Sequence, residues 1–507
     1  MQINALEYLQ ASAARFPDKV AFSDTDEALT FQQLNHRGQA LGTYIAGKTD
    51  KINRPIAVLV ERTAASLAAF MAVLYSGNYY VPIDCQMPVE RMSSILTRLD
   101  PLFVIHSNKT HTLATQLGFP TLSAETGFAA IPDNALTKLR TGKVLDIDPV
   151  YVIFTSGSTG APKGIVISHR SLIDFSDWMA DTFDFSEKDI LANQAPYYFD
   201  LSVKDIYLTL KCAATTHIIP KKLFMTPLAL VQFIDQVKAT SLVWATAAFH
   251  MVANSGALEV CAPKHLNKVI LGGEAMYAKQ LNIWRQALPN TNYVNLYGPT
   301  EVTVDCTYYK IDRPYADDEV IPIGIPCENK EVMLLDESLK PVPPGTPGEI
   351  CVRGTGLAHG YYGDAEKTAA VFVQNPFNPY YPDTIYRTGD IGLLNEEGLI
   401  VFAARRDDQI KHMGYRIELG EIEATLSSLP NLRELACFFD EEKDKIICAY
   451  AGDMDANEII ASIRPLLPKY MFPNIFRKMD ILPRNANSKI DRVKLKEEYF
   501  YESNGNT

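Results

Sequence analysis

The sequence lacks the features of several common classes of protein. Its eight cysteines are scattered without a C-x-x-C pair, which argues against a zinc site or a small disulfide framework. No stretch is long and apolar enough to span a bilayer, and residues 1–16 lack the apolar core of a signal peptide. The net charge of −12 argues against nucleic acid or an anionic membrane as the main partner. We therefore expect a cytoplasmic protein.

The chain has the ordinary composition of a large globular protein, with 47% hydrophobic and 21% charged residues. Because 507 residues exceed a single core, we expect at least two lobes. Short apolar runs alternate with helical spacing, as in residues 56–60, 63–75 and 241–244. This alternation predicts an α/β fold with parallel sheets. A Pro/Gly-rich run at residues 341–348 interrupts this alternation, and the chain beyond Arg405 has the pattern of a small separate α/β unit. The expected domains are therefore 1–404 and 405–507.

One stretch, YVIFTSGSTGAPKG at residues 151–164, stands out. Its first four residues are apolar, β-branched or aromatic and predict a buried strand. The following Ser, Thr and Gly residues let backbone amides and hydroxyls approach a ligand, and Lys163 adds positive charge. The loop therefore suits a polyphosphate, although its Pro-Lys-Gly ending is not that of a Walker A loop. A flexible surface loop is the alternative interpretation of this stretch alone.

Three later stretches supply the rest of a possible nucleotide site: residues 269–274, 293–301 and 386–390. They offer a double glycine and an aromatic face for a purine, and an acid after a tight turn for ribose hydroxyls. The carboxylate of Glu301 is a candidate ligand for Mg²⁺. Each stretch alone is more often structural than functional.

Taken together, these segments carry a family resemblance that covers nearly the whole chain. The chain resembles the adenylate-forming superfamily, specifically the amino-acid adenylation enzymes of non-ribosomal peptide synthesis, with the D-alanine–carrier protein ligases as close relatives. The resemblance implies a large multi-layered N-terminal adenylate-forming domain and a small mobile α/β C-terminal domain. Its segments are FTSGSTGAPKG (154–164), NLYGPTE (295–301), YRTGD (386–390) and RRDDQIKHMGYRIELGEIE (405–423), supported by GNYYVPID (77–84), FDLSVKD (199–205) and NSKIDR (487–492).

The resemblance implies an AMP-forming ligase that uses ATP and Mg²⁺ in two steps. A carboxylate first attacks the α-phosphate of ATP, which gives an acyl-adenylate and pyrophosphate. The phosphopantetheine arm of a carrier protein then takes the acyl group as a thioester. Because only a short tail follows residue 492, we expect a free-standing enzyme that loads a separate carrier protein.

The resemblance also implies residue roles. The residues that match the family's phosphate-binding positions are Thr155, Ser156, Thr159, Lys163 and Thr300, and Glu301 matches its magnesium ligand. The adenine-binding positions match Gly273, Asn295 and Tyr297, and the ribose-binding positions match Asp390 and Arg405. Lys489 matches the catalytic lysine, Asp407 the hinge residue, and residues 414–416 the strand that lines the thiol tunnel. Two positions depart from the family pattern, since Ser488 and Ala404 stand where glycine is usual.

Asp200 is the main clue to the acid that is activated. It matches the aspartate that holds an α-ammonium group in amino-acid-activating relatives, and the alternative is an acid that caps the next helix. The two other charged members of the pocket, Lys204 and Asp305, either pair or face a substrate side chain. D-alanine ligases carry cysteine in place of Gly272. The matching pocket positions are Asp200, Leu201, Lys204, Ala245, Ile270, Gly272, Leu296, Val304 and Asp305.

Three functions remain as alternatives to amino-acid loading of a carrier protein. A D-alanine–carrier protein ligase of teichoic acid modification shares the motifs. An acyl- or aryl-CoA ligase shares the fold, and Asp200 argues against it. A catalytically silent nucleotide-binding module is the third, and the retention of Lys163, Glu301, Asp390 and Lys489 argues against it.

Overall fold

The structure is a computed structural model that describes residues 2–157, 162–406, 409–441, 443–484 and 490–504. Thr159, Asp407 and Lys489, and the Ser488 that precedes this lysine, lie outside these described residues. The chain divides into two compact units. The first comprises Met1–Cys85, Arg98–Ile153 and Gly164–Arg406, and the second comprises Gln86–Thr97, Phe154–Lys163 and Asp407–Thr507.

The largest sheet of the first unit has nine strands, of which the central six are parallel. Short antiparallel strands complete both edges. In spatial order the strands are β15 (Ile325–Pro326), β14 (Thr307–Lys310), β13 (Asn292–Tyr297), β12 (Lys268–Gly272), β11 (Ser241–Ala245), β9 (Ile190–Asn193), β10 (Thr215–Ile218), β1 (Val20–Ser23) and β2 (Ala28–Thr30).

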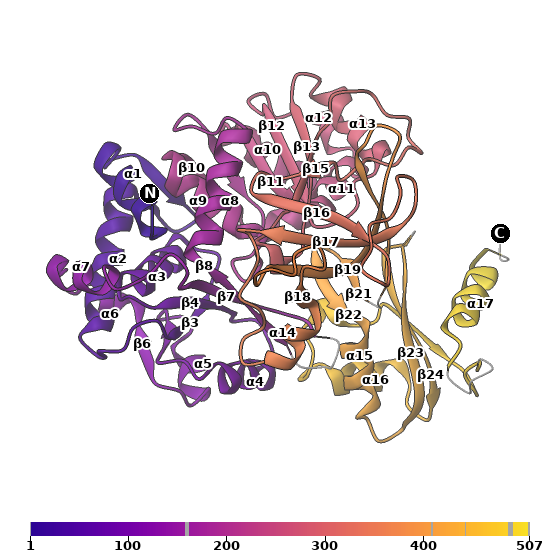
Figure 1. The fold of residues 1–507 in the computed structure, drawn as a ribbon. Coiled ribbons are helices and arrows are strands. Elements are labelled where there is room, and N and C mark those ends of the chain that lie inside the picture. The colour runs from indigo at the N-terminus through magenta and orange to yellow at the C-terminus, as the bar shows by residue number, and fades with distance from the viewer. Residues whose placement is uncertain (1, 158–161, 407–408, 442, 485–489, 505–507) are drawn as a thin grey trace. The chain divides into compact units, whose positions relative to one another are not determined.

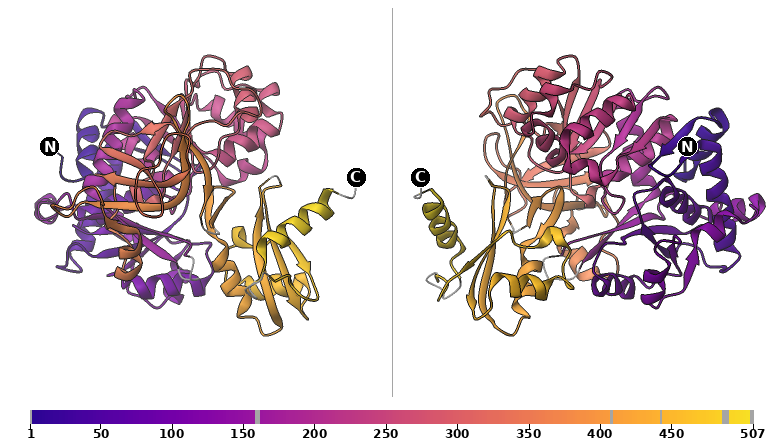
Figure 2. Two further views of the ribbon diagram at one scale, coloured as in Figure 1. Left: turned by 45° about the vertical axis from the view of Figure 1, so that its right-hand side comes forward. Right: turned by 180° about the vertical axis from the view of Figure 1, so that it is seen from behind.

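Helices join these parallel strands, and Figure 1 labels one group of them beside β11, β12 and β13. Figure 2 shows the same group, in pink, from two further sides. Trp244 and Trp284 are fully buried in the core that this group shares with the sheet. The helices along this part are α8 (His169–Thr182), α9 (Leu201–Cys212), η1 (Lys221–Met225), α10 (Pro227–Gln236), α11 (Thr246–Asn254), α12 (Ala257–Val260) and α13 (Ala278–Ala287).

A second sheet has six strands and a helical layer that contains the most apolar helix of the chain. Helix α3 (Ala64–Tyr75) is buried along nearly its whole length, because Ala, Leu, Phe, Met and Val fill almost every position. The strands in order are β6 (Thr121–Ser123), β5 (Val104–His106), β3 (Pro55–Val60), β4 (Tyr79–Asp84), β7 (Pro149–Thr155) and β8 (Lys163–Ser168). The remaining helices here are α1 (Leu6–Arg15), α2 (Phe31–Ala46), α5 (His111–Gln116), α6 (Ala124–Phe128) and α7 (Asn134–Thr141), whereas most of α4 (Val89–Leu99) belongs to the second unit.

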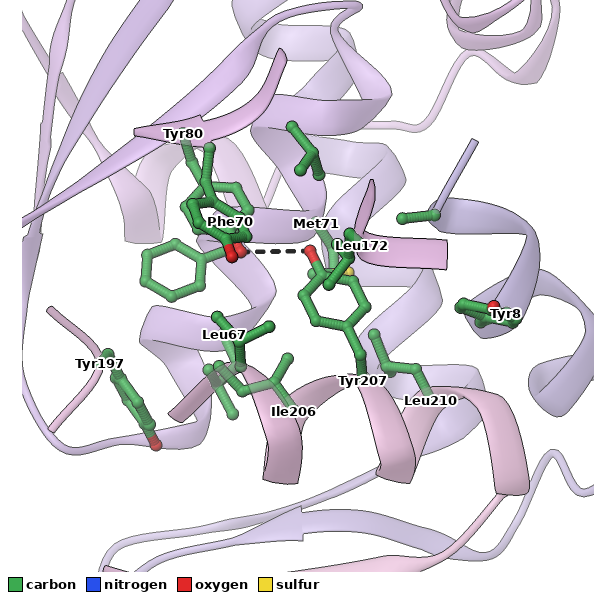
Figure 3. Close-up of a cluster of buried hydrophobic side chains, with 14 of the residues drawn as sticks. Tyr8, Leu67, Phe70, Met71, Tyr80, Leu172, Tyr197, Ile206, Tyr207 and Leu210 are labelled. Atoms are coloured by element: carbon green, nitrogen blue, oxygen red, sulfur yellow. Dashed lines mark hydrogen bonds between the residues drawn. The ribbon is translucent and has the colours of Figure 1, made fainter. Parts of the chain in front are cut away.

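Helix α9 connects the cores of these two sheets. Phe70 of α3 stacks on Tyr80 of β4 with ring centroids 4.3 Å apart, and the Tyr80 hydroxyl lies 3.1 Å from that of Tyr207 on α9 (Figure 3). All three side chains are buried, so the two hydroxyls satisfy each other inside an apolar cluster. This packing fixes α9, whose first turn carries several candidate pocket residues.

The first unit ends in an antiparallel sheet, where consecutive strands mostly pair as hairpins. Its strands are β16 (Lys330–Leu335), β17 (Gly348–Gly354), β18 (Phe372–Gln374), β19 (Thr384–Leu394) and β20 (Ile400–Arg405). The helical segments beside it are η2 (Thr300–Val302) and α14 (Ala365–Val371).

The second unit has its own core of buried side chains between one helical layer and one small sheet. Strand β24 pairs antiparallel with β23 and parallel with β25. The elements are β21 (Gln409–His412), β22 (Tyr415–Glu418), α15 (Leu419–Ser427), β23 (Leu432–Asp440), β24 (Lys445–Gly452), α16 (Ala456–Ile463), η3 (Lys469–Met471), β25 (Ile475–Lys478) and α17 (Arg492–Asn504).

The α/β class predicted from the sequence is confirmed, and the parallel strands at residues 56–60 and 241–244 are present in the two large sheets. The alternation of strands and helices did not predict the antiparallel sheet that closes the first unit. None of the helices in the described chain has both the length and the apolarity needed to cross a bilayer.

Candidate functional site

The candidate pocket residues of the first unit gather at the carboxyl ends of β11, β12 and β13. Ala245 pairs with Gly272 across β11 and β12, and Leu271 pairs with Asn295 across β12 and β13. Ligands bind outside the carboxyl ends of parallel strands, because chain reversals there leave loops and helix starts facing one side. Three sequence segments far apart in the chain are thus aligned by strand register.

Gly272, at the end of β12, lies against Asp305 and Leu296. A Cβ atom on Gly272 would come within 3.3 Å of the Asp305 carboxylate and 3.4 Å of the Leu296 side chain. A larger residue here would press on both neighbours. The cysteine of the D-alanine ligases therefore does not fit without movement of Asp305 or Leu296.

Lys204 and Asp305 form a buried ion pair, with Nζ of Lys204 2.9 Å from Oδ2 of Asp305. Lys204 comes from the first turn of α9 and Asp305 follows a turn after β13, so the pair joins α9 to the segment that follows this turn. A buried charge requires a partner, because water no longer solvates it. Of the two alternatives left open by the sequence, the structure shows the paired one.

Asp200 precedes α9 at its N-cap position, yet its side chain accepts no capping bond from the described backbone of this helix. The expected alternative role of a helix cap is therefore absent. Its negative charge adds to burial in raising the pKa of Tyr151, which places the carboxylate near that ring. Asp200 itself is half-buried, as a carboxylate that receives a cationic ligand must be.

The remaining predicted pocket residues are apolar and mutually packed. Leu201 and Ala245 form a small cluster with Ala195, whereas Ile270, Leu296 and Val304 belong to the main core cluster. A Cβ on Gly273, whose φ is +98°, would lie 3.4 Å from Leu201. The double glycine at the end of β12 thus adjoins α9, where a glycine in the left-handed region avoids backbone strain.

Thr300 and Glu301 lie in η2, the short helix that follows β13, and both are buried. The hydroxyl of Tyr361 donates to Oε1 of Glu301 at 2.9 Å, and the amide of Ala358 donates to the Glu301 backbone carbonyl at 2.9 Å. These two contacts fix both the main chain and the carboxylate of Glu301. A carboxylate held in this way is preorganised for a cation.

The turn after η2 has an unusual backbone. Thr303 has φ +59° and Val304 has φ +68°, and both residues are β-branched. Side chains of this kind clash with the backbone in the left-handed region, at a cost of about 1–2 kcal/mol per residue. Lys330 of β16 donates from its buried ammonium to the carbonyls of Val302 at 2.9 Å and of Asp305. The surrounding structure therefore enforces this turn.

Tyr297, Asp390 and Arg405 form a second polar cluster. The Tyr297 hydroxyl donates to Oδ2 of Asp390 at 2.6 Å, and Arg405 donates to Oδ1. Asp390 and Arg405 are direct partners across β19 and β20. Burial raises the pKa of Tyr297 well above its usual value, and the charge of Asp390 raises it further, so the hydroxyl stays a donor. Asn295 donates to the carbonyl of Pro322 at 2.9 Å.

The second unit contains the described residues of the expected phosphate loop. Thr155 ends β7, and its hydroxyl is buried without a hydrogen-bond partner among the described residues. The Ser156 hydroxyl donates to the carbonyl of Arg416 at 2.7 Å, which is a contact within this unit. Lys163 lies 3.7 Å from Glu418. In this unit Glu421 also accepts a bond from the amide of Gly157 at 3.3 Å.

The residues present fit ATP and Mg²⁺ in their chemistry. The unsatisfied Thr155 hydroxyl is a donor of the kind that binds a phosphate oxygen, and Glu301 offers a fixed carboxylate of the kind that binds Mg²⁺. Asp390 offers an acceptor of the kind that binds ribose hydroxyls.

Three residues of this region were missed by the sequence. Lys330 and Tyr361 lie in segments without a motif, and their roles depend on contacts with a turn that is distant in sequence. Asp205 lies within the FDLSVKD motif, but only the structure shows that it is fully buried beside Asn193, with a pKa raised by burial to about 7.

The comparisons with known proteins agree with this geometry. The family described as "AMP-binding enzyme" matches residues 9–362. Tyrocidine synthase 1 of Brevibacillus parabrevis is 30% identical over 507 residues, covering 97% of this chain and 44% of the relative. The dimodular nonribosomal peptide synthase of Bacillus subtilis (strain 168) is 32% identical over 503 residues, covering 97% of this chain and 21% of the relative.

The chain thus spans less than half the length of these curated relatives. Among solved structures it is similar to IdnL1, with a TM-score of 0.80, 27% identity, and coverage of 95% of this chain and 99% of that one. It shares the fold of holo-PA1221, a protein with adenylation and PCP domains, with a TM-score of 0.84 and 24% identity over 98% of this chain and 84% of that one. The resemblance found in the sequence motifs is confirmed, and the chain belongs to the AMP-binding enzyme family, with nonribosomal peptide synthetases among its homologues.

Proposed function

We propose that the protein adenylates an amino acid with ATP and transfers it as a thioester to the phosphopantetheine arm of a separate carrier protein. Enzymes of this family form adenylates from ATP, so the proposal concerns the acid and the acceptor. The observation that carries it is Asp200, a half-buried carboxylate at the start of α9 whose negative charge acts on the buried Tyr151. Such a carboxylate fits the α-ammonium group of an amino acid.

The pocket pair supports a neutral substrate side chain. Because Lys204 and Asp305 neutralise each other at 2.9 Å, the pocket wall presents dipoles and no net charge. A charged side chain would have to displace one partner of a buried pair, which leaves the other unpaired at a high desolvation cost. We therefore expect a small or medium neutral amino acid, held by Asp200 through its ammonium group.

The remaining residues have proposed parts in the first step. Thr155, Lys163 and Thr300 would bind phosphate oxygens, Asp390 and Arg405 the ribose, and Gly273, Asn295 and Tyr297 the adenine. Glu301 would hold Mg²⁺, which neutralises phosphate charge when bound. Lys489 would contact the reacting carboxylate and phosphate, and Asp407 would be the hinge between domains 1–404 and 405–507.

The test is pyrophosphate exchange with each proteinogenic amino acid, D-alanine and a set of aryl acids. We expect exchange with one or a few neutral amino acids and none with the aryl acids. Exchange only with D-alanine would favour the teichoic acid ligase, and product formation with aryl acids and coenzyme A would favour the CoA ligase. Absence of exchange with every amino acid would overturn the proposal.

Two variants test the residue assignments. Asp200→Asn should raise KM for the amino acid by about a hundredfold with little change in KM for ATP, since a charge-assisted contact is lost. The control is Asp177→Asn, because Asp177 accepts bonds from Tyr8 and Lys211, away from the pocket residues.

Lys489→Ala should abolish adenylate formation and spare thioester formation from supplied adenylate. Equal loss of both half-reactions would mean that the lysine is structural.

A further inference from the structure

Lys330 places a buried ammonium in a cage of backbone carbonyls. It is the first residue of β16, and its side chain extends to the turn after η2. Nζ donates to the carbonyl oxygens of Val302 at 2.9 Å, Thr303 at 3.5 Å and Asp305. Among the described residues, no carboxylate lies within ion-pair distance of this ammonium, whereas the buried Lys204 and Arg405 each have one. Lys330 thus pairs with no described acid, and its hydrogen bonds all go to the main chain.

The turn that Lys330 contacts would not keep its shape unaided. Thr303 and Val304 are two consecutive β-branched residues in the left-handed region. Three carbonyls of this turn converge on one point, and without a cation there their dipoles would repel one another. Thr303 adds one further restraint, because its hydroxyl donates to the carbonyl of Gly356 at 2.7 Å.

The surroundings are shaped to admit a lysine. A Cβ on Gly356 would lie 2.4 Å from Cε and 2.8 Å from Nζ of Lys330, so only glycine leaves room for this side chain. The ammonium also lies 5.2 Å from the ring centroid of Phe175, a favourable distance for a cation–π contact. A compact point charge fits this space, whereas the broad guanidinium of arginine does not.

The position of the turn gives Lys330 its importance. Glu301 lies on one side of the left-handed pair of residues and Asp305 on the other. Glu301 is fixed by Tyr361, and Asp305 is fixed by Lys204 on α9. The spacing between the carboxylate expected to hold magnesium and the charged Asp305 therefore depends on the backbone conformation of the three intervening residues, 302–304.

We propose that Lys330 is a positioning residue that serves as a built-in monovalent cation and holds the 302–305 turn in its strained shape. In this role it sets the distance between the metal-binding and amino-acid-binding sides of the site. The inference rests on the proposed function, because it assigns those two sides to magnesium and to the amino acid. It requires no contact between Lys330 and any substrate.

The first experiment compares Lys330→Met with Lys268→Met. Lys268 is the control, since it also begins a strand, donates to the carbonyl of Asp184 at 2.8 Å and lies over a phenylalanine ring, but at the far end of β12. It differs from Lys330 in that it also pairs with Asp189 at 3.0 Å, so its loss perturbs the fold away from the 302–305 turn. We expect Lys330→Met to lower kcat/KM for pyrophosphate exchange by about a hundredfold, because misplacement of reacting groups by about an ångström costs that much. Lys268→Met should change it less than threefold, even though the loss of its Asp189 pair lowers thermal stability.

The second experiment is chemical rescue of Lys330→Ala. This substitution removes three methylene groups and the ammonium, and n-propylammonium supplies the same atoms. We expect 10–50 mM n-propylammonium to restore at least a tenth of the lost exchange rate, whereas n-propanol, of equal size and without charge, restores none. Equal rescue by the alcohol would show that only volume is needed and would overturn the cation role. No rescue by either, with normal stability, would also overturn it.

A third readout separates this inference from the proposed function. Hydrogen exchange of the amides in residues 300–306 can be measured on the unliganded protein, without any turnover. We expect Lys330→Met to accelerate exchange in this segment and Lys268→Met to leave it unchanged. If no amino acid supports pyrophosphate exchange in the unsubstituted protein, the proposed function fails, while this measurement still tests whether Lys330 holds the 302–305 turn. Unchanged hydrogen exchange in residues 300–306 of Lys330→Met would refute the proposed role of Lys330 and leave the proposed function untouched.

Discussion

Two buried ion pairs of the first unit differ in the elements they connect and in how exposed they are. The pocket pair, Lys204 and Asp305, joins a helix to a turn 101 residues away, and its side chains are 0% and 3% exposed. The strand pair, Arg405 and Asp390, joins directly opposed residues of β19 and β20, and its arginine is 13% exposed. In the strand pair, both oxygens of Asp390 are bonded, one to Arg405 and one to Tyr297.

The difference indicates which pair is the more sensitive to change. Removal of either partner of the pocket pair leaves a charge in a site that water does not reach, and this is the most costly outcome for a buried pair. Removal of Arg405 leaves Asp390, whose side chain is only 4% exposed, with one remaining described donor, the Tyr297 hydroxyl. We expect the pocket pair to control stability, and the strand pair to affect mainly nucleotide binding.

The largest expected effect comes from breaking the pocket pair. Lys204→Met should lower the free energy of unfolding of the first unit by about 3–5 kcal/mol, because Asp305 stays buried and unpaired. Denaturant unfolding followed by tryptophan fluorescence measures this unit selectively, since Trp178, Trp244 and Trp284 all lie in it. The double variant Lys204→Met with Asp305→Leu should recover most of the loss. A double variant as unstable as the single one would contradict this explanation.

Breaking the strand pair should have a smaller effect on stability. Arg405→Met should cost about 1.5–3 kcal/mol, the range for a hydrogen bond to a charged group. The same variant should raise KM for ATP at least tenfold and change KM for the amino acid by less than twofold. An equal rise in both constants would mean that the two pairs are not functionally separate.

Asp205 provides a test that depends on pH, one residue along α9 from the pocket pair. Burial raises the pKa of Asp205 from 3.8 to about 7, while its Asn193 hydrogen bond and the charges of Lys204 and Arg62 oppose the rise. The folded state therefore holds a proton that the unfolded state releases between about pH 4 and pH 7. Stability should fall as pH rises through this window, by at most about 1.4 kcal/mol per pH unit.

Asp205→Asn should remove this slope, because asparagine does not ionise. The measurement is the free energy of unfolding of both proteins between pH 4.5 and pH 8, with Asp177→Asn as the control. A pH slope that is identical in Asp205→Asn and the unsubstituted protein would show that Asp205 is ionised throughout.

The smallest effect is expected from Tyr297→Phe. It removes one neutral hydroxyl donor from Asp390 and leaves the arginine contact in place. The expected loss is about 0.5–1.5 kcal/mol, as for an ordinary hydrogen bond. Differential scanning calorimetry can resolve such a change, and a loss as large as that of Arg405→Met would mean that the tyrosine supports the strand pair equally.

The sequence predicted the elements of the site better than its contacts. Strands 269–272 and 293–297 are apparent from their apolar runs, because local pattern determines a buried parallel strand. Strand register then placed Ala245, Gly272 and Asn295 at one edge. The sequence offered the pairing of Lys204 with Asp305 as one of two alternatives but could not decide between them, since the pairing depends on the path of a turn that no propensity favours.

Other parts of the site depend on long-range packing in the same way. Ser156 matches a phosphate position, yet its hydroxyl donates to the backbone of Arg416 within the second unit. Lys330 stands in a segment that reads as an ordinary strand start, and only the folded turn reveals what its ammonium does. Motifs identify the residues that meet a ligand, but they do not identify the residues that hold those residues in place.

Gly298 limits how this pocket can be re-engineered. A Cβ there would come within 2.5 Å of the Asp305 Cα and 2.6 Å of the Val304 carbonyl, because the turn crosses back over β13 at this residue. Mutant libraries aimed at new substrates should therefore keep Gly298 and Gly356 invariant. Substitutions are better introduced at Leu201, Ala245 and Ile270. These residues lie in a regular helix or strand, whose backbone hydrogen bonds keep its geometry when a side chain changes.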